Sequence, residues 1–380
     1  MKAPEEILCS PDSVGKIGLV PTRGAYELTK QVNDYLLQWT VGSAENGTYI
    51  LENKCPRFSS GDAKGMLCET VRGRDLYFLV DVGNYGCTYD LFGQQNHMSP
   101  DDHYQDLKRL IQATGGKARR ITVIMPVLYG GRQHKRGGRE SLDCACMLQE
   151  LRRMGVTNLI TFDAHDPSVQ NAAPLMGFDN VIPYYHALKA LRNNFSTLTY
   201  TKDSFMIVSP DEGAMHRNMY YSSILGVDLG MFYKRRDYSK MVNGHNPIVA
   251  HEYLGSAVEG KDVFVTDDLI SSGESILDIA YVLKEKRARN IYCFATYALF
   301  TNGLEAFDLA YQNGVIAGVM GTNLTYRTEA LLSRPWFYEV DVSKYVAYLI
   351  AAINHQVSIS SIIDPHAKIE SLFRQKKELG

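Results

Sequence analysis

The sequence lacks several features that would assign it to a particular class of protein. No stretch reaches the roughly 18 apolar residues of a membrane-spanning helix, and MKAPEEILCS at the start has neither a basic flank nor a long apolar run. Neither a GxxxxGK[ST] loop nor a GxGxxG motif occurs. No charge sign dominates, since 40 Lys and Arg residues balance 42 Asp and Glu residues. We therefore expect a cytoplasmic protein without a membrane partner, and neither a P-loop ATPase nor a chain whose overall charge attracts nucleic acid.

Cysteine is scarce and scattered. The seven residues, at positions 9, 55, 68, 87, 144, 146 and 293, are odd in number and form no CxxC pair. Cys144 and Cys146 lie two apart in a predicted helix, where they face different sides and make a poor metal or redox pair. We expect the cysteines to be small buried hydrophobic residues in a reducing compartment.

The material for a folded protein is ample. The chain has 380 residues, of which 45% are hydrophobic, and a domain usually takes about 100 to 200 residues. This excludes a disordered or low-complexity chain and predicts two domains.

Short apolar runs alternate with stretches of helical periodicity. The runs are 76–82, 121–129, 158–164, 204–210, 262–267 and 291–300. Apolar residues three and four apart predict helices over 105–113, 142–154, 186–193 and 275–287. Strands that are apolar on both faces are typical of parallel sheets covered by helices, so we predict an α/β fold.

The boundary between two α/β units is expected near 178–186, after the third predicted strand. The polar segment 83–103 is rich in Gly and Asn, which predicts a surface loop.

Four of the predicted strands end in polar clusters. These clusters are YGGRQ at 129–133, DAHD at 163–166, SPDEG at 209–213 and DDLISSG at 267–273. Ligands of open parallel sheets bind beyond the carboxyl ends of the strands, so these clusters are candidate site residues.

Segment 262–275, DVFVTDDLISSGES, carries the sharpest chemical signal. A strand runs into two carboxylates and then into a loop of small residues, before a helix begins near Ser275. Backbone N–H groups at a helix N-terminus bind anions, so the loop predicts a phosphate site. The basic run at 132–139 lacks interleaved aromatic residues, so we do not expect it to bind RNA.

Seven motifs in unbroken order resemble those of the ribose-phosphate pyrophosphokinase family. The loop at 267–275 is similar to the phosphoribosyl-pyrophosphate signature that this family shares with type I phosphoribosyltransferases. The further matches are RFSSGD (57–62) with ETVRGRDLYFL (69–79), MPVLYGGRQHKRGGRE (125–140), TFDAHD (161–166), VSPDEG (208–213), GVDLGMFYKRR (226–236) and VSISSII (357–363).

The resemblance implies two type I phosphoribosyltransferase-like domains, each a mainly parallel sheet flanked by helices. Residues 1–183 would form the domain on the ATP side and 184–348 the domain on the ribose-phosphate side. Segment 349–380 would pack back on the first domain. The family also implies a homodimer or homohexamer.

On the ATP side, the resemblance implies that Phe58 stacks on adenine. The other nucleotide-binding residues would be Ser60, Asp62, Arg132, Gln133 and His134.

On the ribose-phosphate side, the resemblance implies binding by Asp267, Asp268, Ser271, Ser272, Gly273, Glu274 and Ser275. The pyrophosphate loop would be Asp211, Glu212 and Gly213. His165 and Asp211 would hold Mg²⁺ on the ATP, and His165 would also serve in catalysis. Lys234 and Arg236 begin a polar run that is typical of a mobile loop, and they would close over the triphosphate.

The implied activity is transfer of the β,γ-pyrophosphoryl group of ATP to the C1 hydroxyl of ribose 5-phosphate, which yields 5-phosphoribosyl 1-pyrophosphate and AMP. The chain departs from the family at Glu274, where glycine is usual, and at His134, where aspartate is usual; Ser60 and Asp62 also differ. Three alternatives stay open. They are a pyrophosphokinase acting on another 5-substituted ribose such as ADP-ribose, a phosphoribosyltransferase, and a non-catalytic regulatory homologue.

Overall fold

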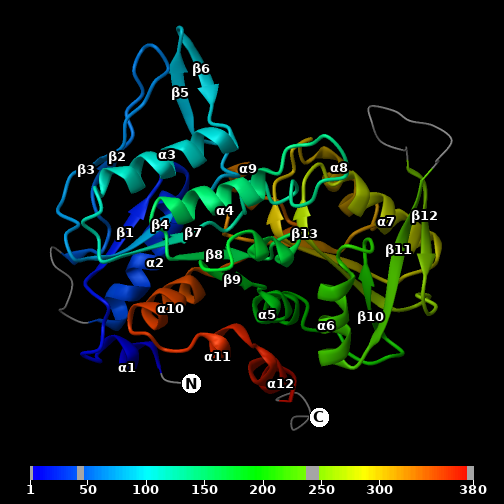
Figure 1. Ribbon diagram of the computed structural model, residues 1–380. Coiled ribbons are helices and arrows are strands. Elements are labelled where there is room, and N and C mark those ends of the chain that lie inside the picture. Colours follow the sequence, from blue (N-terminus) through cyan, green and yellow to red (C-terminus); the bar gives the residue numbers. More distant parts are fainter. Residues whose placement is uncertain (1–2, 41–46, 237–247, 375–380) are drawn as a thin grey trace. The chain divides into compact units, whose positions relative to one another are not determined.

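The computed structural model describes residues 3–40, 47–236 and 248–374 (Figure 1). The chain forms two compact units. The first contains residues 1–183, 323–326 and 341–364, and the second contains 184–322, 327–340 and 365–380. The chain first passes from one unit to the other between Pro183 and Tyr184.

The first unit is built on a five-stranded parallel sheet in the order β1-β4-β7-β8-β9. Its strands are β1 Ile17–Pro21, β4 Asp75–Leu79, β7 Arg120–Ile124, β8 Asn158–Phe162 and β9 Gly177–Val181. Helices α3 (Pro100–Ala113) and α4 (Asp143–Arg153) cover one face of this sheet, and α2 (Tyr26–Trp39) and α10 (Ser343–Asn354) lie across the other (Figure 1). Short elements complete the unit: α1 Pro4–Leu8, η1 Arg23–Ala25, β2 Asn53–Lys54, β3 Met66–Leu67, η3 Pro167–Ala172 and α11 Ser360–Ile363.

The second unit has a seven-stranded sheet in the order β12-β11-β10-β13-β14-β15-β16, parallel except for the antiparallel edge strand β12. The strands are β10 Phe205–Ser209, β11 Asp228–Arg236, β12 Ile248–Leu254, β13 Asp262–Ile270, β14 Ile291–Ala298, β15 Gly318–Thr322 and β16 Phe337–Val340. The helices are α5 Tyr184–Asn194, α6 Met215–Leu225, α7 Glu274–Glu285, α8 Glu305–Gln312, α9 Glu329–Leu332 and α12 His366–Arg374.

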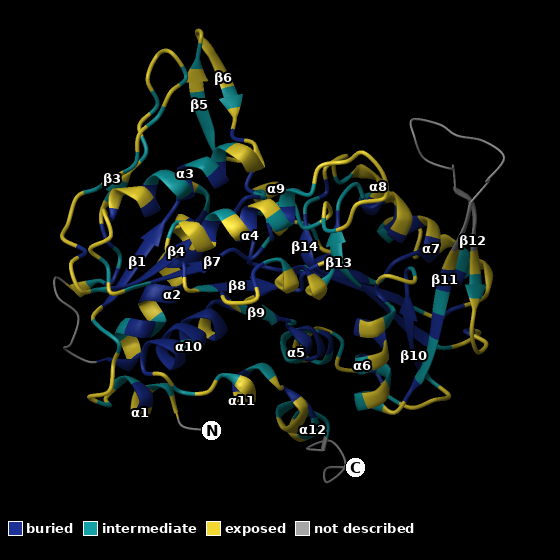
Figure 2. Ribbon diagram, in the orientation of Figure 1, coloured by how far each residue is buried: buried dark blue, intermediate teal, exposed yellow. Residues whose placement is uncertain are grey.

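Both sheets are buried on two faces, as their apolar runs require (Figure 2). Every residue of β4, β10 and β14 is buried. In the first unit, alternate strand residues such as Phe78 and Val123 pack with Leu107 of α3 and Leu148 of α4. This arrangement confirms the predicted α/β class with two mainly parallel sheets flanked by helices.

Several strands escaped prediction because their sequences carry weak signals. β1 ends in proline, β15 contains two glycines, and β9 is largely polar. Their pairing is decided by neighbouring strands rather than by their own propensity.

Segment 83–103 is not the simple surface loop that its composition predicts. It contains a hairpin, β5 (Thr88–Leu91) paired with β6 (Gln94–His97), and the first turn of α3. Phe92 and Gly93 form the turn with φ angles of 52° and 74°, the left-handed geometry that matches strand twist in a two-residue hairpin.

Two further expectations need correction. Cys9, Cys68 and Cys146 are exposed, whereas the burial expected of cysteine holds fully for Cys144 and Cys293. The C-terminal segment 349–380 does not pack as a whole on the first unit, because α12 belongs to the second. There Phe373 packs edge-on against Tyr200, with ring centroids 4.8 Å apart.

Candidate active site

In the second unit, two predicted polar clusters meet at one edge of the sheet. β10 and β13 are parallel neighbours, so the loops that follow Ser209 and Ile270 leave the sheet at the same edge. Asn218 of α6 ties the two strand ends together: its Nδ2 donates to Ser209 Oγ at 3.3 Å and to the carbonyl of Thr266 at 3.0 Å. Thr266 Oγ1 donates in return to Asn218 Oδ1 at 2.8 Å.

This edge concentrates carboxylates. Asp267 and Asp268 lie near the end of β13. Burial, together with the neighbouring Asp268 and Asp211, raises the pKa of Asp267 well above its usual value. Asp211 Oδ1 accepts the backbone N–H of Ala214 at 3.0 Å, which fixes the loop after β10. Arg217 of α6 places Nη1 3.7 Å from Asp267 Oδ1, and its side chain is only 9% exposed. In the described part of the chain, these acidic groups thus lie beside the buried guanidinium of Arg217, an arrangement suited to polyhydroxylated ligands.

The loop from Ser271 to Ser275 has the backbone geometry of an anion site. Gly273 has φ 85°, and an added Cβ would lie 2.3 Å from Phe307 Cε2, so this position admits only glycine. α7 begins at the next residue. No hydrogen bond in the described part of the chain engages the backbone N–H groups of Ser271, Ser272, Gly273 and Ser275. Free N–H groups at a helix N-terminus attract phosphate.

Glu274 is the first residue of this helix, and its side chain is exposed. Its backbone N–H donates to Ser272 Oγ at 3.4 Å, and its Oε1 accepts from Asn302 Nδ2 at 3.1 Å. The carboxylate is thus held toward the loop that follows β14.

In the first unit, the clusters after β7 and β8 also meet, because these strands are parallel neighbours. The His134 and His165 rings lie 5.5 Å apart between centroids, and His134 Nε2 lies 3.4 Å from Asp166 Oδ2. Asp163, at the end of β8, is buried in the left-handed region with φ 46°. This backbone conformation is strained for a residue other than glycine. The chain turns at Asp163, and His165, two residues later, is exposed.

Asp166 is held as an anion. Its Oδ1 accepts from Ser168 Oγ at 2.6 Å and from the Ser168 backbone N–H at 2.9 Å. These hydrogen bonds, with the nearby His134 and Lys135, lower the pKa of Asp166. Arg132 and Gln133 are exposed beside this group and can reach a ligand.

The segment 57–62 forms a tight turn that presents Phe58 to solvent. The backbone N–H of Phe58 donates to the Asp62 carbonyl at 2.7 Å, and Ser60 Oγ donates to Asp62 Oδ2 at 2.9 Å. Phe58 is 47% exposed, an unusual state for a phenylalanine and one that suits stacking on a flat ligand. Arg57 anchors the turn through two bonds to the Asp106 carboxylate, at 2.6 and 3.0 Å.

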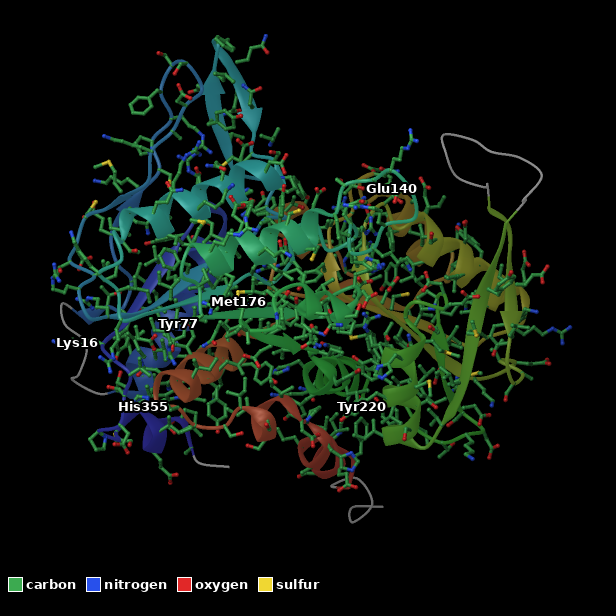
Figure 3. The ribbon with its side chains drawn as sticks, viewed as in Figure 1. Lys16, Tyr77, Glu140, Met176, Tyr220 and His355 are labelled. Atoms are coloured by element: carbon green, nitrogen blue, oxygen red, sulfur yellow. The ribbon has the colours of Figure 1, made fainter. Side chains whose placement is uncertain are left out.

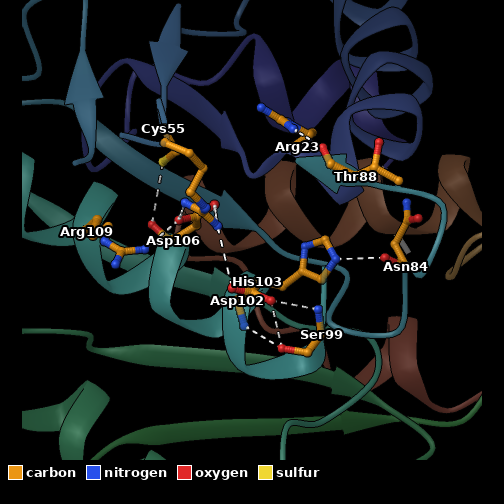
Figure 4. Close-up of polar contacts among 10 residues, drawn as sticks. Arg23, Cys55, Asn84, Thr88, Ser99, Asp102, His103, Asp106 and Arg109 are labelled. Atoms are coloured by element: carbon orange, nitrogen blue, oxygen red, sulfur yellow. Dashed lines mark hydrogen bonds and ion pairs between the residues drawn. The ribbon is translucent and has the colours of Figure 1, made fainter. Parts of the chain in front are cut away.

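Helix α3 serves as the common support for these parts of the first unit. Asp106 of this helix, labelled in Figure 4, accepts the hydrogen bonds of Arg57. The same helix holds Tyr129, whose hydroxyl donates to Asp101 at 2.6 Å and whose ring stacks on Tyr104 at 4.5 Å. The turn with Phe58 and the strand end that leads to Arg132 are therefore positioned by the same helix.

The polar sequence around Lys234 and Arg236 predicts a loop, but the two residues do not lie in one. Their backbone extends β11, where Lys234 is paired with His251 and Arg236 with Ile248 of β12. Their side chains, and the rest of the polar run at 237–247, lie outside the described residues.

Within the described ranges, no group of three or more His, Cys, Asp or Glu residues is arranged to hold a metal ion. His165 lies in the first unit and Asp211 in the second. A search of the same residues found no helix with the length and apolar character needed to cross a membrane.

Comparison with known proteins identifies the family. A model of the N-terminal domain of ribose phosphate pyrophosphokinase matches residues 17–155, and a phosphoribosyl transferase domain model matches residues 186–308. The chain belongs to the ribose-phosphate pyrophosphokinase family. A ribose-phosphate pyrophosphokinase of Rhodopirellula baltica is 27% identical over 309 residues, which cover 80% of this chain and 88% of the relative. One from Vibrio cholerae is 25% identical, with coverage of 81% and 90%.

One solved structure agrees with this family assignment in fold. The crystal structure of phosphoribosylpyrophosphate synthetase from Mycobacterium smegmatis superposes with a TM-score of 0.72 at 22% identity, covering 89% of this chain and 98% of that one. This supports the two phosphoribosyltransferase-like sheets described above.

Three residues of the site had not been predicted from the sequence. Arg217 and Asn218 follow the SPDEG motif by a few positions, and that proximity was the available signal. Asn302 gave no signal, because its contact with Glu274 spans 28 residues.

Proposed function

We propose that this chain is a ribose-phosphate pyrophosphokinase, which transfers the β,γ-pyrophosphoryl group of ATP to the C1 hydroxyl of ribose 5-phosphate. The products are 5-phosphoribosyl 1-pyrophosphate and AMP. The observation that carries the proposal is the edge of the second sheet, where paired carboxylates adjoin a turn of free N–H groups in a chain that matches both domains of the family.

In the second unit, Asp267 and Asp268 accept hydrogen bonds from the ribose hydroxyls. The N–H groups from Ser271 to Ser275 hold the 5-phosphate at the start of α7. The loop of Asp211, Glu212 and Gly213 receives the pyrophosphoryl group. This arrangement orients the C1 hydroxyl for attack, and orientation supplies much of the catalysis in such a reaction.

In the first unit, Phe58 stacks on adenine and Ser60 and Asp62 contact the nucleotide from the same turn. Arg132, Gln133 and His134 bind the phosphates, with Arg132 able to donate two parallel hydrogen bonds. From β11 of the second unit, Lys234 and Arg236 bring positive charge to the transferred group.

The family resemblance assigns Mg²⁺ to His165 and Asp211, and we propose these two residues as its protein ligands. Magnesium prefers few protein ligands and keeps phosphate oxygens and water in its shell, so a pair of residues suffices. When bound, it neutralises charge on the transferred phosphates.

The assembly and location belong to the same proposal. We propose a homodimer or homohexamer, as the family resemblance implies. A cytoplasmic location suits seven cysteines that are all free thiols.

The test is an acceptor-dependent release of AMP. Purified protein with ATP, Mg²⁺ and ribose 5-phosphate should form AMP and 5-phosphoribosyl 1-pyrophosphate in equal amounts, followed by ³¹P NMR. Formation of ADP would contradict pyrophosphoryl transfer. Formation of AMP only after addition of an active homologue would assign the chain to a regulatory role instead.

A further inference from the structure

The hairpin β5–β6 projects from the first unit beside the loop that joins β2 to β3 (Figure 1). That loop contains the turn 57–62, and two side chains of β5 contact it. Leu91 packs on Gly61, where an added Cβ would lie 3.1 Å from Leu91 Cδ1. The Tyr89 ring lies against the Arg57 guanidinium, with Arg57 Cζ 5.2 Å from the ring centroid. The hairpin therefore holds the turn at two points.

These contacts follow from the alternation of side chains along a strand. Tyr89 and Leu91 are two positions apart, so they lie on the same face of β5, and both are half-buried. Asp90 lies between them in the sequence, on the opposite face, and is exposed. One face of the hairpin thus packs on the turn, while the face that carries Asp90 is open to solvent.

The base of the hairpin is fixed to the body of the first unit. Arg23 Nη1 donates to the Thr88 carbonyl at 2.7 Å (Figure 4). Tyr85, just before β5, packs edge-on against Tyr326, with ring centroids 5.2 Å apart. The Tyr326 ring also covers Gly86, where an added Cβ would lie 2.5 Å from Tyr326 Cζ. The hairpin is therefore an anchored arm, and it can hold the turn in place.

The turn needs such support to present its aromatic ring. Phe58 is 47% exposed, so the packing of its own side chain does little to fix the orientation of the ring. Arg57 ties the start of the turn to α3, and Leu91 contacts the turn again at Gly61. A turn held at both places loses less conformational freedom when a ligand stacks on its ring, so the ligand binds more tightly.

We infer that the hairpin β5–β6 is a positioning element of the nucleotide site. Tyr89 and Leu91 hold the turn 57–62 in the conformation in which Phe58 stacks on the base of ATP. The two residues act through the turn, and they raise the affinity for the base without taking part in the transfer of the phosphates. The inference rests on the proposed function, because it takes Phe58 as the residue that stacks on adenine.

The experiment separates binding of the base from binding of the phosphates. Calorimetry in the presence of Mg²⁺ gives the Kd of a non-hydrolysable ATP analogue and of tripolyphosphate, which has three phosphates but no base. AMP release with ATP and ribose 5-phosphate gives kcat and KM. The variants are Tyr89→Ala and Leu91→Ala, with Tyr89→Phe as the conservative replacement. Asp90→Ala is the control on the opposite face of the same strand, and circular dichroism checks that each variant is folded.

Tyr89→Ala and Leu91→Ala should each weaken binding of the ATP analogue by about fivefold, because a loosened turn loses part of the stacking between Phe58 and the base. The Kd of tripolyphosphate and kcat at saturating ATP should not change. Tyr89→Phe keeps a ring against Arg57 and should bind the analogue as wild-type protein does. Asp90→Ala should do the same, because it leaves the contacts with the turn intact.

A double-mutant cycle decides whether the hairpin acts through Phe58. Phe58→Ala alone should weaken binding of the ATP analogue by about tenfold, and in that background Tyr89→Ala should change the Kd by less than about twofold. An equal effect of Tyr89→Ala with and without Phe58, or an equal loss of tripolyphosphate affinity, would overturn the inference. Unchanged affinity for the analogue in Tyr89→Ala and Leu91→Ala would also overturn it.

Failure of the proposed function is a separate outcome, because the affinities are measured directly. Protein that shows the expected binding pattern but releases no AMP would refute the proposed function and support the positioning role. Protein that releases AMP with ribose 5-phosphate, but whose KM for ATP is the same in Tyr89→Ala and Leu91→Ala, would support the function and overturn the positioning role.

Discussion

At the scale of single residues, like charges lie close together at the edge of the second sheet. Asp267 is held against Asp268 and near Asp211 in a partly buried position, which raises its pKa. Such an arrangement costs stability and persists where function needs it. Arg217 is the nearest compensating charge, at 3.7 Å from Asp267.

Replacing Arg217 tests that compensation. Arg217→Met should raise the KM for the acceptor by about tenfold, because the loss of a nearby positive charge strengthens repulsion among the carboxylates and weakens their contacts with the sugar. Arg217→Lys keeps the charge and should retain most of the affinity. The measurement is steady-state AMP release with each substrate varied in turn. A rise of equal size in the KM for ATP would point to a general structural defect instead.

Lys234 carries the second prediction at this scale. If its ammonium group stabilises charge on the transferred phosphates, Lys234→Ala should lower kcat by more than tenfold, a loss of about 1.4 kcal/mol or more of transition-state stabilisation. Lys202→Ala, at an exposed position before β10, provides a control. Circular dichroism checks that both variants are folded. Unchanged turnover in Lys234→Ala would remove this residue from the mechanism.

At the scale of elements, the first unit is joined through a buried ion pair. Asp75 of β4 is fully buried, and Arg120 of β7 donates to it from Nε at 2.8 Å and from Nη2 at 2.6 Å. Tyr77, in the interior of the unit (Figure 3), and Asn354 of α10 donate to the same carboxylate at 2.7 and 2.8 Å. Two strands and a helix from the distant C-terminal segment thus meet at one carboxylate.

Removing the cation should therefore destabilise the unit strongly. Arg120→Met should lower the free energy of unfolding by about 3 kcal/mol, because it leaves a buried carboxylate without its charge partner. Lys54→Ala breaks the ion pair between Lys54 and Glu52, in which both side chains are 60% exposed. This variant should change the free energy of unfolding by less than about 0.5 kcal/mol. Urea unfolding, followed by the fluorescence of Trp39 in a Trp336→Phe background, measures the free energy of unfolding of both variants. Similar small effects for the two variants would show that solvent screens Asp75.

At the scale of the whole molecule, the first unit is not continuous in sequence. Helix α10 closes one face of its sheet with almost all of its side chains buried, and Tyr348 of α10 packs on Trp39 at 6.5 Å. The two tryptophans divide between the units, with Trp39 in the first and Trp336 in the second, and both are buried.

Two deletions separate the roles of the C-terminal elements. In a Trp336→Phe background, deletion of 341–380 should shift Trp39 emission to the red, since losing α10 exposes apolar surface that its buried side chains cover and removes the contact of Trp39 with Tyr348. Deletion of 365–380 removes α12 alone and should leave Trp39 emission unchanged. Blue-shifted emission retained in the longer deletion would show that residues 1–183 fold without α10.

Much of the fold and of the candidate site followed from the sequence. Strands such as β4 and β10 are buried on both faces. Such strands need apolar residues at successive positions, so a continuous apolar run predicts them. The polar groups after β10 and β13 were found because parallel strands bring their carboxyl ends to one edge, whatever the rest of the fold. Gly273 was predicted only as part of a loop of small residues; the structure gives the reason for glycine there, because an added Cβ would meet Phe307.

The tertiary structure decided what depends on contacts between distant residues. Three contacts join segments far apart in the chain: that of Arg217 with Asp267, that of Asn302 with Glu274, and the network around Asp75. The identity of a side chain's partner produces no periodic pattern in the sequence, so these contacts could not be predicted from it. The same holds for the hairpin β5–β6 and for the division of the C-terminal helices between the units. Local patterns specify which residues are buried, whereas the free energy of burying them together selects their neighbours.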